Sequence, residues 1–107
     1  MEEKQTIEGV YNALKALNIV YNQADFSRLC GKSAMWFSCL KARRLSITAD
    51  AALTLAYKLR RKARTSICPT TYTELMTISD ALFEIAEHKI EKKIAFEEQW
   101  AETNESV

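Results

Sequence analysis

The stretch QADFSRLCGKSAMWFSCLKA, residues 23–42 of the chain, decides the fold. Apolar residues recur in it at three- and four-residue spacing on both sides of Gly31, so each half offers one apolar stripe to a shared core. Gly31 is predicted to take the left-handed backbone conformation that ends the first helix, because other residues adopt it only at a cost. Ser27, one turn after Gln23, must be small if the two helix axes are to cross closely. The predicted core residues of this helix, turn and helix are Phe26, Leu29, Cys30, Phe37 and Leu40.

This unit resembles the helix-turn-helix of the λ repressor/Cro-like DNA-binding superfamily. The matching positions are Gln23, Phe26, Ser27, Cys30, Gly31, Phe37 and Leu40. Residues 48–59 are similar to the capped helix that follows the unit in that superfamily, so the resemblance covers roughly residues 6 to 60. It implies an all-α protein of five helices, in which a helix-turn-helix domain over residues 1–64 presents residues 33–42 to duplex DNA and a long C-terminal helix is the fifth. It also implies a bacterial source.

Composition points to the same fold class. The 107-residue chain has only two glycines and one proline and no alternating run of β-branched residues, so it is predicted to be all-α. No apolar run approaches the ~20 residues that span a bilayer, and residues 1–4 lack the form of a signal peptide. We therefore expect a cytoplasmic protein without contact to a membrane, built as one domain with an extension.

Reactive and metal-binding residues are few. Cys30, Cys39 and Cys68 lack CxxC-type spacing, so reduced thiols are expected, with a metal site that includes His88 as the alternative. The chain has one histidine, no glycine-rich phosphate loop and no paired acids in an apolar setting. No arrangement for nucleophilic, metal or acid–base catalysis follows from it. The sequence predicts a protein that is not an enzyme and needs no cofactor or metal.

Charge is unevenly distributed along the chain. Residues 23–65 carry ten lysines and arginines against two aspartates, a net charge of +8, whereas residues 66–107 carry three lysines against nine acids, a net charge of −6. This division suggests a basic module that faces DNA or another anion, joined to an acidic extension. The alternative is that both segments are ordinary solvated helix faces.

Capping residues mark the expected helix boundaries. Thr6 is predicted to cap a first helix that Asn18 ends, and Asn22 to cap the next helix, with Asp25 in its first turn. Thr48 is predicted to cap the fourth helix. Thr71 and Glu74 form a capping-box pattern before a long helix over residues 71–103, after a linker at residues 65–70. Residues 1–5 and 103–107 are expected to be frayed or disordered.

The DNA-facing residues are expected around residues 33–42. Ser33, Ala34, Met35 and Ser38 lie on the predicted outward face with Cys39 and Ala42, but that face lacks the Arg, Lys, Asn or Gln that usually reads base edges. The turn also departs from the superfamily pattern, which has an apolar residue in place of Lys32 and a glycine in place of Arg43. Phosphate contacts remain the stronger expectation, from Gln23, Lys32, Lys41, Arg43 and Arg44. Trp36 is expected either to pack partly on the core or to anchor a protein partner.

The long C-terminal helix carries the expected partner contacts. Its apolar stripe is Leu75, Ile78, Leu82, Ile85, Ile90 and Ile94. At ~1.5 Å per residue the helix exceeds 40 Å, which is longer than a small domain is wide, so part of it is expected to contact a second chain. A helix that folds back on the chain's own core is the alternative.

Two functions are compatible with the sequence. The first is a small helix-turn-helix transcriptional regulator that binds duplex DNA as a homodimer. The second is a module that has turned from DNA to a protein partner, which it contacts through Met35, Trp36 or the C-terminal helix.

Overall fold

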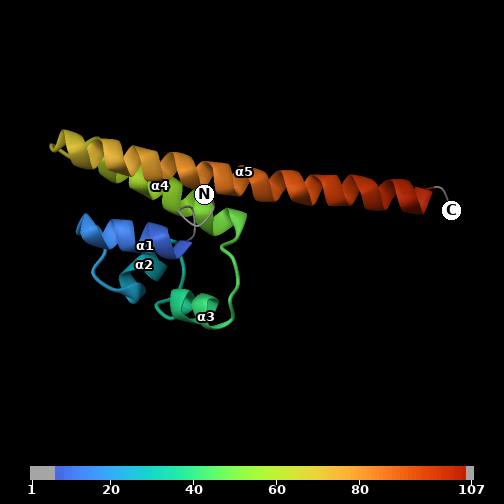
Figure 1. Cartoon of the computed structure of the whole chain (residues 1–107), viewed down its shortest axis with the longest axis horizontal. Helices are drawn as coiled ribbons and strands as arrows, with labels where there is room; N and C mark the ends of the chain where they lie inside the picture. Colours follow the sequence, from blue (N-terminus) through green and yellow to red (C-terminus); the bar gives the residue numbers. More distant parts are fainter. Residues whose placement is uncertain (1–6, 106–107) are drawn as a thin grey trace.

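Five helices make up the computed structural model, which describes residues 7–105, and the side chains of residues 7–101 (Figure 1). The helices are α1 (Ile7–Ala16), α2 (Gln23–Leu29), α3 (Trp36–Ala42), α4 (Ala49–Thr65) and α5 (Pro69–Glu105), and the described residues contain no strand. The predicted all-α fold with five helices and a long C-terminal helix is therefore confirmed. The predicted cap Thr6 and the frayed residues 1–5 lie outside the described residues.

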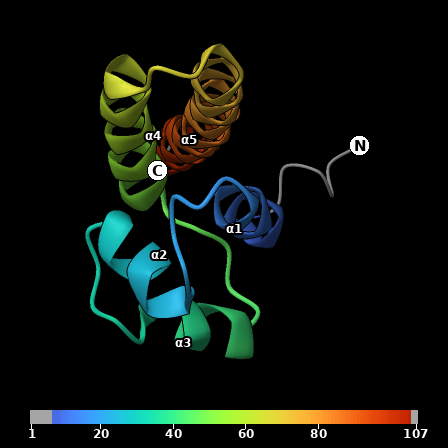
Figure 2. The same cartoon turned by 90° about the vertical axis from the view of Figure 1, so that its left-hand side faces the viewer.

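The helices form two groups. The long helices α4 and α5 lie side by side as an antiparallel pair, and α1, α2 and α3 pack beneath them, with α3 farthest from α5 in both views (Figures 1 and 2). The C-terminal half of α5 projects past the other helices, so the molecule measures 59 × 29 × 25 Å. One core unites the two groups.

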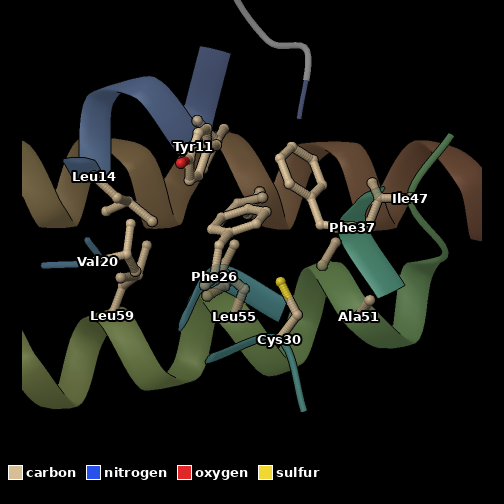
Figure 3. Close-up of a cluster of buried hydrophobic side chains, with 14 of the residues drawn as sticks. Tyr11, Leu14, Val20, Phe26, Cys30, Phe37, Ile47, Ala51, Leu55 and Leu59 are labelled. Atoms are coloured by element: carbon tan, nitrogen blue, oxygen red, sulfur yellow. The ribbon is translucent and has the colours of Figure 1, made fainter. Parts of the chain in front are cut away.

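Aromatic residues from three helices fill the centre of this core (Figure 3). The rings of Tyr11, Phe26 and Phe37 contact one another with centroid distances of 4.8–5.4 Å. Aromatic contacts of this kind add about 0.5–1.5 kcal/mol each to the energy of burial. Cys30 and Leu40 are buried with them, as predicted, whereas Leu29 is only half-buried.

Three helix ends share one hydrogen-bond pattern. Asn18, Gly31 and Arg44 have φ angles of 62°, 80° and 55°, and each follows the last turn of a helix. In each case the left-handed residue and the residue after it donate backbone N–H bonds to carbonyls of that last turn, such as Lys32 to Ser27 at 2.9 Å. This Schellman arrangement satisfies carbonyls that a helix end leaves free. The predictions for Asn18 and Gly31 are confirmed, while nothing in the sequence marked Arg44.

The caps of α2 and α4 agree with the sequence. Asn22 Oδ1 accepts the N–H of Asp25 at 2.9 Å, and Thr48 Oγ1 accepts the N–H of Ala51 at 3.2 Å. These bonds satisfy N–H groups that the first turn of a helix leaves without a partner. Both predicted caps are confirmed.

Helix α3 starts at Trp36, three residues later than the predicted range 33–42. The side chain of its N-cap residue, Met35, makes no capping hydrogen bond. The hydroxyl of Ser27 on α2 substitutes for it and accepts the N–H of Phe37 at 2.9 Å. Because Ser27 is fully buried, both its small size and its hydroxyl fix how α3 sits on α2.

Helix α5 begins at Pro69 rather than after Thr71, and only residues 66–68 separate it from α4. Proline suits the first position of a helix because the missing N–H has no helical partner there. The helix runs on through Glu105, so the expectation of disorder is wrong for residues 103–105, and residues 106–107 lie outside the described range.

The two halves of α5 differ in burial. The face that packs on α4 consists of Leu75, Ser79, Leu82 and Ala86, all buried. Leu75 and Leu82 are therefore not available to a second chain, which corrects their assignment as partner contacts, and Ile78 and Ile85 are half-buried against the same core. The alternative of a helix folded back on its own core holds for this half. Every residue from 90 to 100, called the projecting segment below, is exposed.

Candidate nucleic-acid interface

Most of the predicted DNA-facing residues belong to α3 and the turn before it, and α3 lies on the side of the molecule opposite α5 (Figures 1 and 2). Arg44, which follows α3, also lines a groove against α5. We call the predicted DNA-facing residues together the α3 surface. It comprises Gln23, Lys32, Ser33, Ala34, Met35, Ser38, Lys41, Arg43 and Arg44. Of these, Gln23, Lys32, Ala34, Ser38 and Lys41 are half-buried and the others are exposed.

A side-chain hydrogen bond ties the start of α2 to α3. The hydroxyl of Ser38 donates to Oε1 of Gln23 at 2.8 Å. In this arrangement the amide nitrogen of Gln23 is the group that remains to donate to an anion. The N-terminus of α2 itself suits a phosphate less well than expected, because the carboxylate of Asp25 already lies there and accepts the N–H of Tyr21 at 3.2 Å. The expected phosphate contact thus depends on the Gln23 side chain.

Two of the four predicted phosphate-binding cations pair with acids. Lys32 lies 3.6 Å from Asp50, and Lys41 lies 3.5 Å from Glu8, with its ammonium also 5.3 Å from the centre of the Phe37 ring. Surface pairs of this kind contribute about 0–1 kcal/mol, so a phosphate can displace the acid at modest cost.

The two arginines after α3 differ from these lysines. Both are exposed, and neither has an ion-pair partner among the described residues. Arg44 in addition holds a left-handed conformation that costs a residue with a Cβ about 1 kcal/mol relative to glycine. Arg43 and Arg44 are therefore the cations of the α3 surface that are most available to a phosphate.

The rest of the α3 surface is weakly polar. Met35 is 66% exposed, and Ser33 and Cys39 are exposed beside it. Trp36 is half-buried and packs against the core, which agrees with the first of its two expected roles.

The basic end of α4 is partly used inside the molecule. Arg60 donates from Nε to the Ser79 hydroxyl and from its terminal nitrogen to Asp80, both at 2.9 Å, and its guanidinium lies 4.4 Å from the centre of the Phe83 ring. Arg60 therefore links α4 to α5 rather than facing a nucleic acid. Arg61, Lys62 and Arg64 are exposed.

A groove of about 720 Å³ lies between the start of α1, residues 44–47 and α5. Leu45, Ile47 and Ile85 line its apolar part, and Arg44 and Lys89 lie at it, with Lys89 Nζ 2.9 Å from the Ser46 hydroxyl. His88 is exposed at this groove. The sequence did not indicate the groove, because it joins segments some 40 residues apart and no local pattern marks such a contact.

The three cysteines lie in different environments. Burial raises the pKa of Cys30 to about 12, whereas Cys39 and Cys68 are exposed. Cys68 precedes α5, where hydrogen bonds from the N–H and hydroxyl of Thr71 and from the N–H of Thr70 lower the pKa of its thiol. Within residues 7–101, no three cysteine, histidine, aspartate or glutamate side chains gather as they would around a metal ion.

No described helix is both long enough and apolar enough to cross a membrane.

Comparison with known proteins identifies a family but no activity. No curated protein and no solved structure shows significant similarity to the chain. A family model described as a family of unknown function, DUF6626, matches residues 7–101, which include all five helices up to the end of the projecting segment. The chain belongs to the DUF6626 family.

Proposed function

We propose that the protein is a small transcriptional regulator of the λ repressor/Cro-like helix-turn-helix type, which binds duplex DNA through the α3 surface and acts as a homodimer. One observation carries this proposal. Helix α3 is held on α2 by the Ser27–Phe37 and Gln23–Ser38 hydrogen bonds, on the side away from α5, with Arg43 and Arg44 exposed at its end.

Phosphate contacts dominate the proposed binding. The major groove, about 12 Å wide, admits one helix, and the arginines after α3 then reach the backbone on its rim. The outward side chains of α3 offer serine hydroxyls and apolar contacts for thymine methyl groups, but no bidentate partner for a base. Binding is accordingly expected to be salt-sensitive and only weakly selective among sequences.

The conformation of Arg44 fits this role. A glycine at this position would end α3 without strain, so the arginine costs stability that its charge does not recover through any ion pair with a described residue. Strained residues gather at functional sites, where the side chain compensates for its cost by contact with a ligand. A DNA phosphate is the ligand that suits two adjacent guanidinium groups on a surface.

The experiment compares two pairs of charge-removing substitutions. Four or five phosphate contacts predict a log–log salt slope of roughly −4 for duplex binding. Arg43→Ala with Arg44→Gly should reduce that slope by about two and weaken binding to every duplex, while the unstrained glycine keeps or raises the melting temperature. The matched control, Arg61→Ala with Arg64→Ala on α4, removes the same charge from another surface and should leave the slope within about half a unit.

Two results would contradict the proposal. One is undetectable duplex binding by the folded protein at about 50 mM salt. The other is an equal loss of binding in both variant pairs, because a site on the α3 surface predicts different losses.

Met35 favours a second function, recognition of another protein. It is a flexible apolar side chain, 66% exposed, at the N-cap of a helix whose outward face lacks base-reading residues. Met35→Ala should then abolish capture of a partner while duplex binding and circular dichroism remain unchanged. Met35 alone is the appropriate substitution, because Trp36 packs on the core and its removal would disturb the fold.

A further inference from the structure

The projecting segment, residues 90–100 of α5, has large apolar side chains in solvent. Ile90 and Ile94 are 41% and 46% exposed, and Phe96 and Trp100 are 67% and 61% exposed. Four such residues within 11 consecutive exposed positions form a surface that water solvates poorly. In the first half of α5 the apolar side chains are covered by α4. Helix α4 does not extend as far as the projecting segment.

The charged side chains of the projecting segment lack ion-pair partners within the described part of the chain. Lys92, Lys93, Glu97 and Glu98 make no ion pair with any residue whose side chain is described. Lys93 and Glu97 are four residues apart on one helix, yet they remain separate. A lysine that precedes the glutamate is the weaker order for such a helical pair.

The order of charged and apolar residues along the projecting segment indicates in which direction a second helix packs on it. Ala95 is the midpoint of residues 90–100, and reversal of the sequence about it places Lys93 opposite Glu97. At about 100° per residue these two side chains lie on the face that carries the four apolar residues, whereas Lys92 and Glu98 lie about 120° to either side of that face. The same reversal places Ile90 opposite Trp100 and Ile94 opposite Phe96. A parallel alignment would instead set lysine beside lysine and glutamate beside glutamate.

We propose that a second copy of this chain packs antiparallel on the projecting segment, with the two-fold axis level with Ala95. A two-fold symmetric interface uses the same patch on both copies. In an antiparallel pair of helices, the residues of that patch must therefore be complementary to the same residues read in the opposite direction. The apolar residues supply the burial, and two Lys93–Glu97 pairs, one on each side of the two-fold axis, fix the direction and the register.

The ends of the proposed interface also fit. In this register, residues 101–105 of one copy run alongside residues 85–89 of the other, where Ile85, His88 and Lys89 line the groove of about 720 Å³. The remaining helices of each copy lie toward the opposite end of α5 (Figure 1), so the two bodies stay apart. An interface of about three helical turns per copy is at the small end of specific interfaces, and association in the micromolar range is expected.

This inference deepens the homodimer part of the proposed function and rests on that part alone. Association is measured without DNA, and duplex binding through Arg43 and Arg44 is measured separately below the concentration at which the dimer forms. A failure of one experiment therefore leaves the other intact.

Sedimentation of three charge variants tests the proposal. Lys93→Glu and Glu97→Lys each place like charges opposite each other and should weaken self-association about tenfold or more. The double variant that combines both changes restores every pair and keeps the wild-type composition. It should self-associate within about threefold of wild type, as should an equimolar mixture of the two single variants.

Other outcomes overturn the proposal. Wild type that remains monomeric up to about 100 µM excludes the dimer. A double variant as weak as the single variants shows that the charges do not face each other in this register. Preferential pairing of wild type with the double variant indicates a parallel dimer. Circular dichroism should give the same melting temperature for all variants as for wild type at monomeric concentration, since these side chains are exposed.

Discussion

The two halves of α5 have similar apolar spacing but different surroundings. Leu75 and Leu82 in the first half are buried, whereas Ile90 and Ile94 in the second half are exposed. The difference follows from the length of α4, whose 17 residues can cover about as many residues of an antiparallel neighbour. An apolar stripe thus indicates which face of a helix needs a partner, and the neighbouring helix determines where that partner comes from.

The largest expected effect separates the halves by stability. Leu82→Ala removes a fully buried side chain and should lower the free energy of unfolding by about 3–4 kcal/mol, because it loses the transfer energy and leaves a cavity. Ile94→Ala in the projecting segment should change it by less than about 0.5 kcal/mol at monomeric concentration. Urea titrations followed by circular dichroism measure both. Equal losses of unfolding free energy would show that the two halves of α5 contribute equally to the stability of the core.

A smaller effect tests the polar contact within the first half. Ser79 donates to the carbonyl of Ala56 at 3.2 Å and accepts from Arg60. Ser79→Ala should lower the free energy of unfolding by about 1–2 kcal/mol, because it removes both bonds in a buried position. The matched control is Thr77→Ala on the exposed side of the same helix, whose hydroxyl bonds only the carbonyl of Thr73. A cost no larger than that of the control would show that Ser79 does not help hold α5 on α4.

The start of α5 can be tested through Cys68 by the pH dependence of alkylation. Hydrogen bonds from Thr71 and Thr70 lower its pKa below the ordinary value of 9.0, so the reactive thiolate should form at lower pH in the folded protein than in urea. A Cys39→Ser background removes the other exposed thiol, and the pKa of about 12 keeps Cys30 slow. Identical pH profiles in the folded and unfolded protein would contradict this helix start.

The smallest expected effect on global stability comes from Ala95→Gly. Glycine in a helix costs about 1 kcal/mol relative to alanine, but at this position the cost should be confined to the projecting segment. Circular dichroism of the monomer should lose a little helical signal, while the midpoint of the urea titration remains unchanged. A shifted midpoint would mean that the projecting segment unfolds together with the core.

Much of the fold follows from local residue types. Asn22 and Thr48 cap helices as predicted, and Gly31 adopts the predicted positive φ. The left-handed Arg44 could not be predicted, because arginine has no preference for that conformation. The small size of Ser27 was predicted from the close helix crossing, but its bond to Phe37 was not, because that bond depends on where α3 begins.

The candidate site was predictable in part. The basic residues around α3 were identified from the sequence, but the acids that pair with Lys32 and Lys41 come from α4 and α1 and depend on the tertiary fold. The division of α5 was available from the sequence through the 17 residues of α4 and the short linker. The apolar spacing of α5 does not by itself reveal this division, because the spacing continues beyond the residues that α4 covers.

Hydrogen exchange along α5 at two protein concentrations tests most directly whether the first half belongs to the core and the second half to a partner. Amides of residues 75–86 should exchange slowly at all concentrations. Amides of residues 90–100 should exchange quickly at low micromolar concentration, because these residues are exposed and α4 does not cover them, and slowly at a concentration where the dimer predominates. Uniform protection along α5 in the monomer, or fast exchange of residues 90–100 at every concentration, would contradict the account.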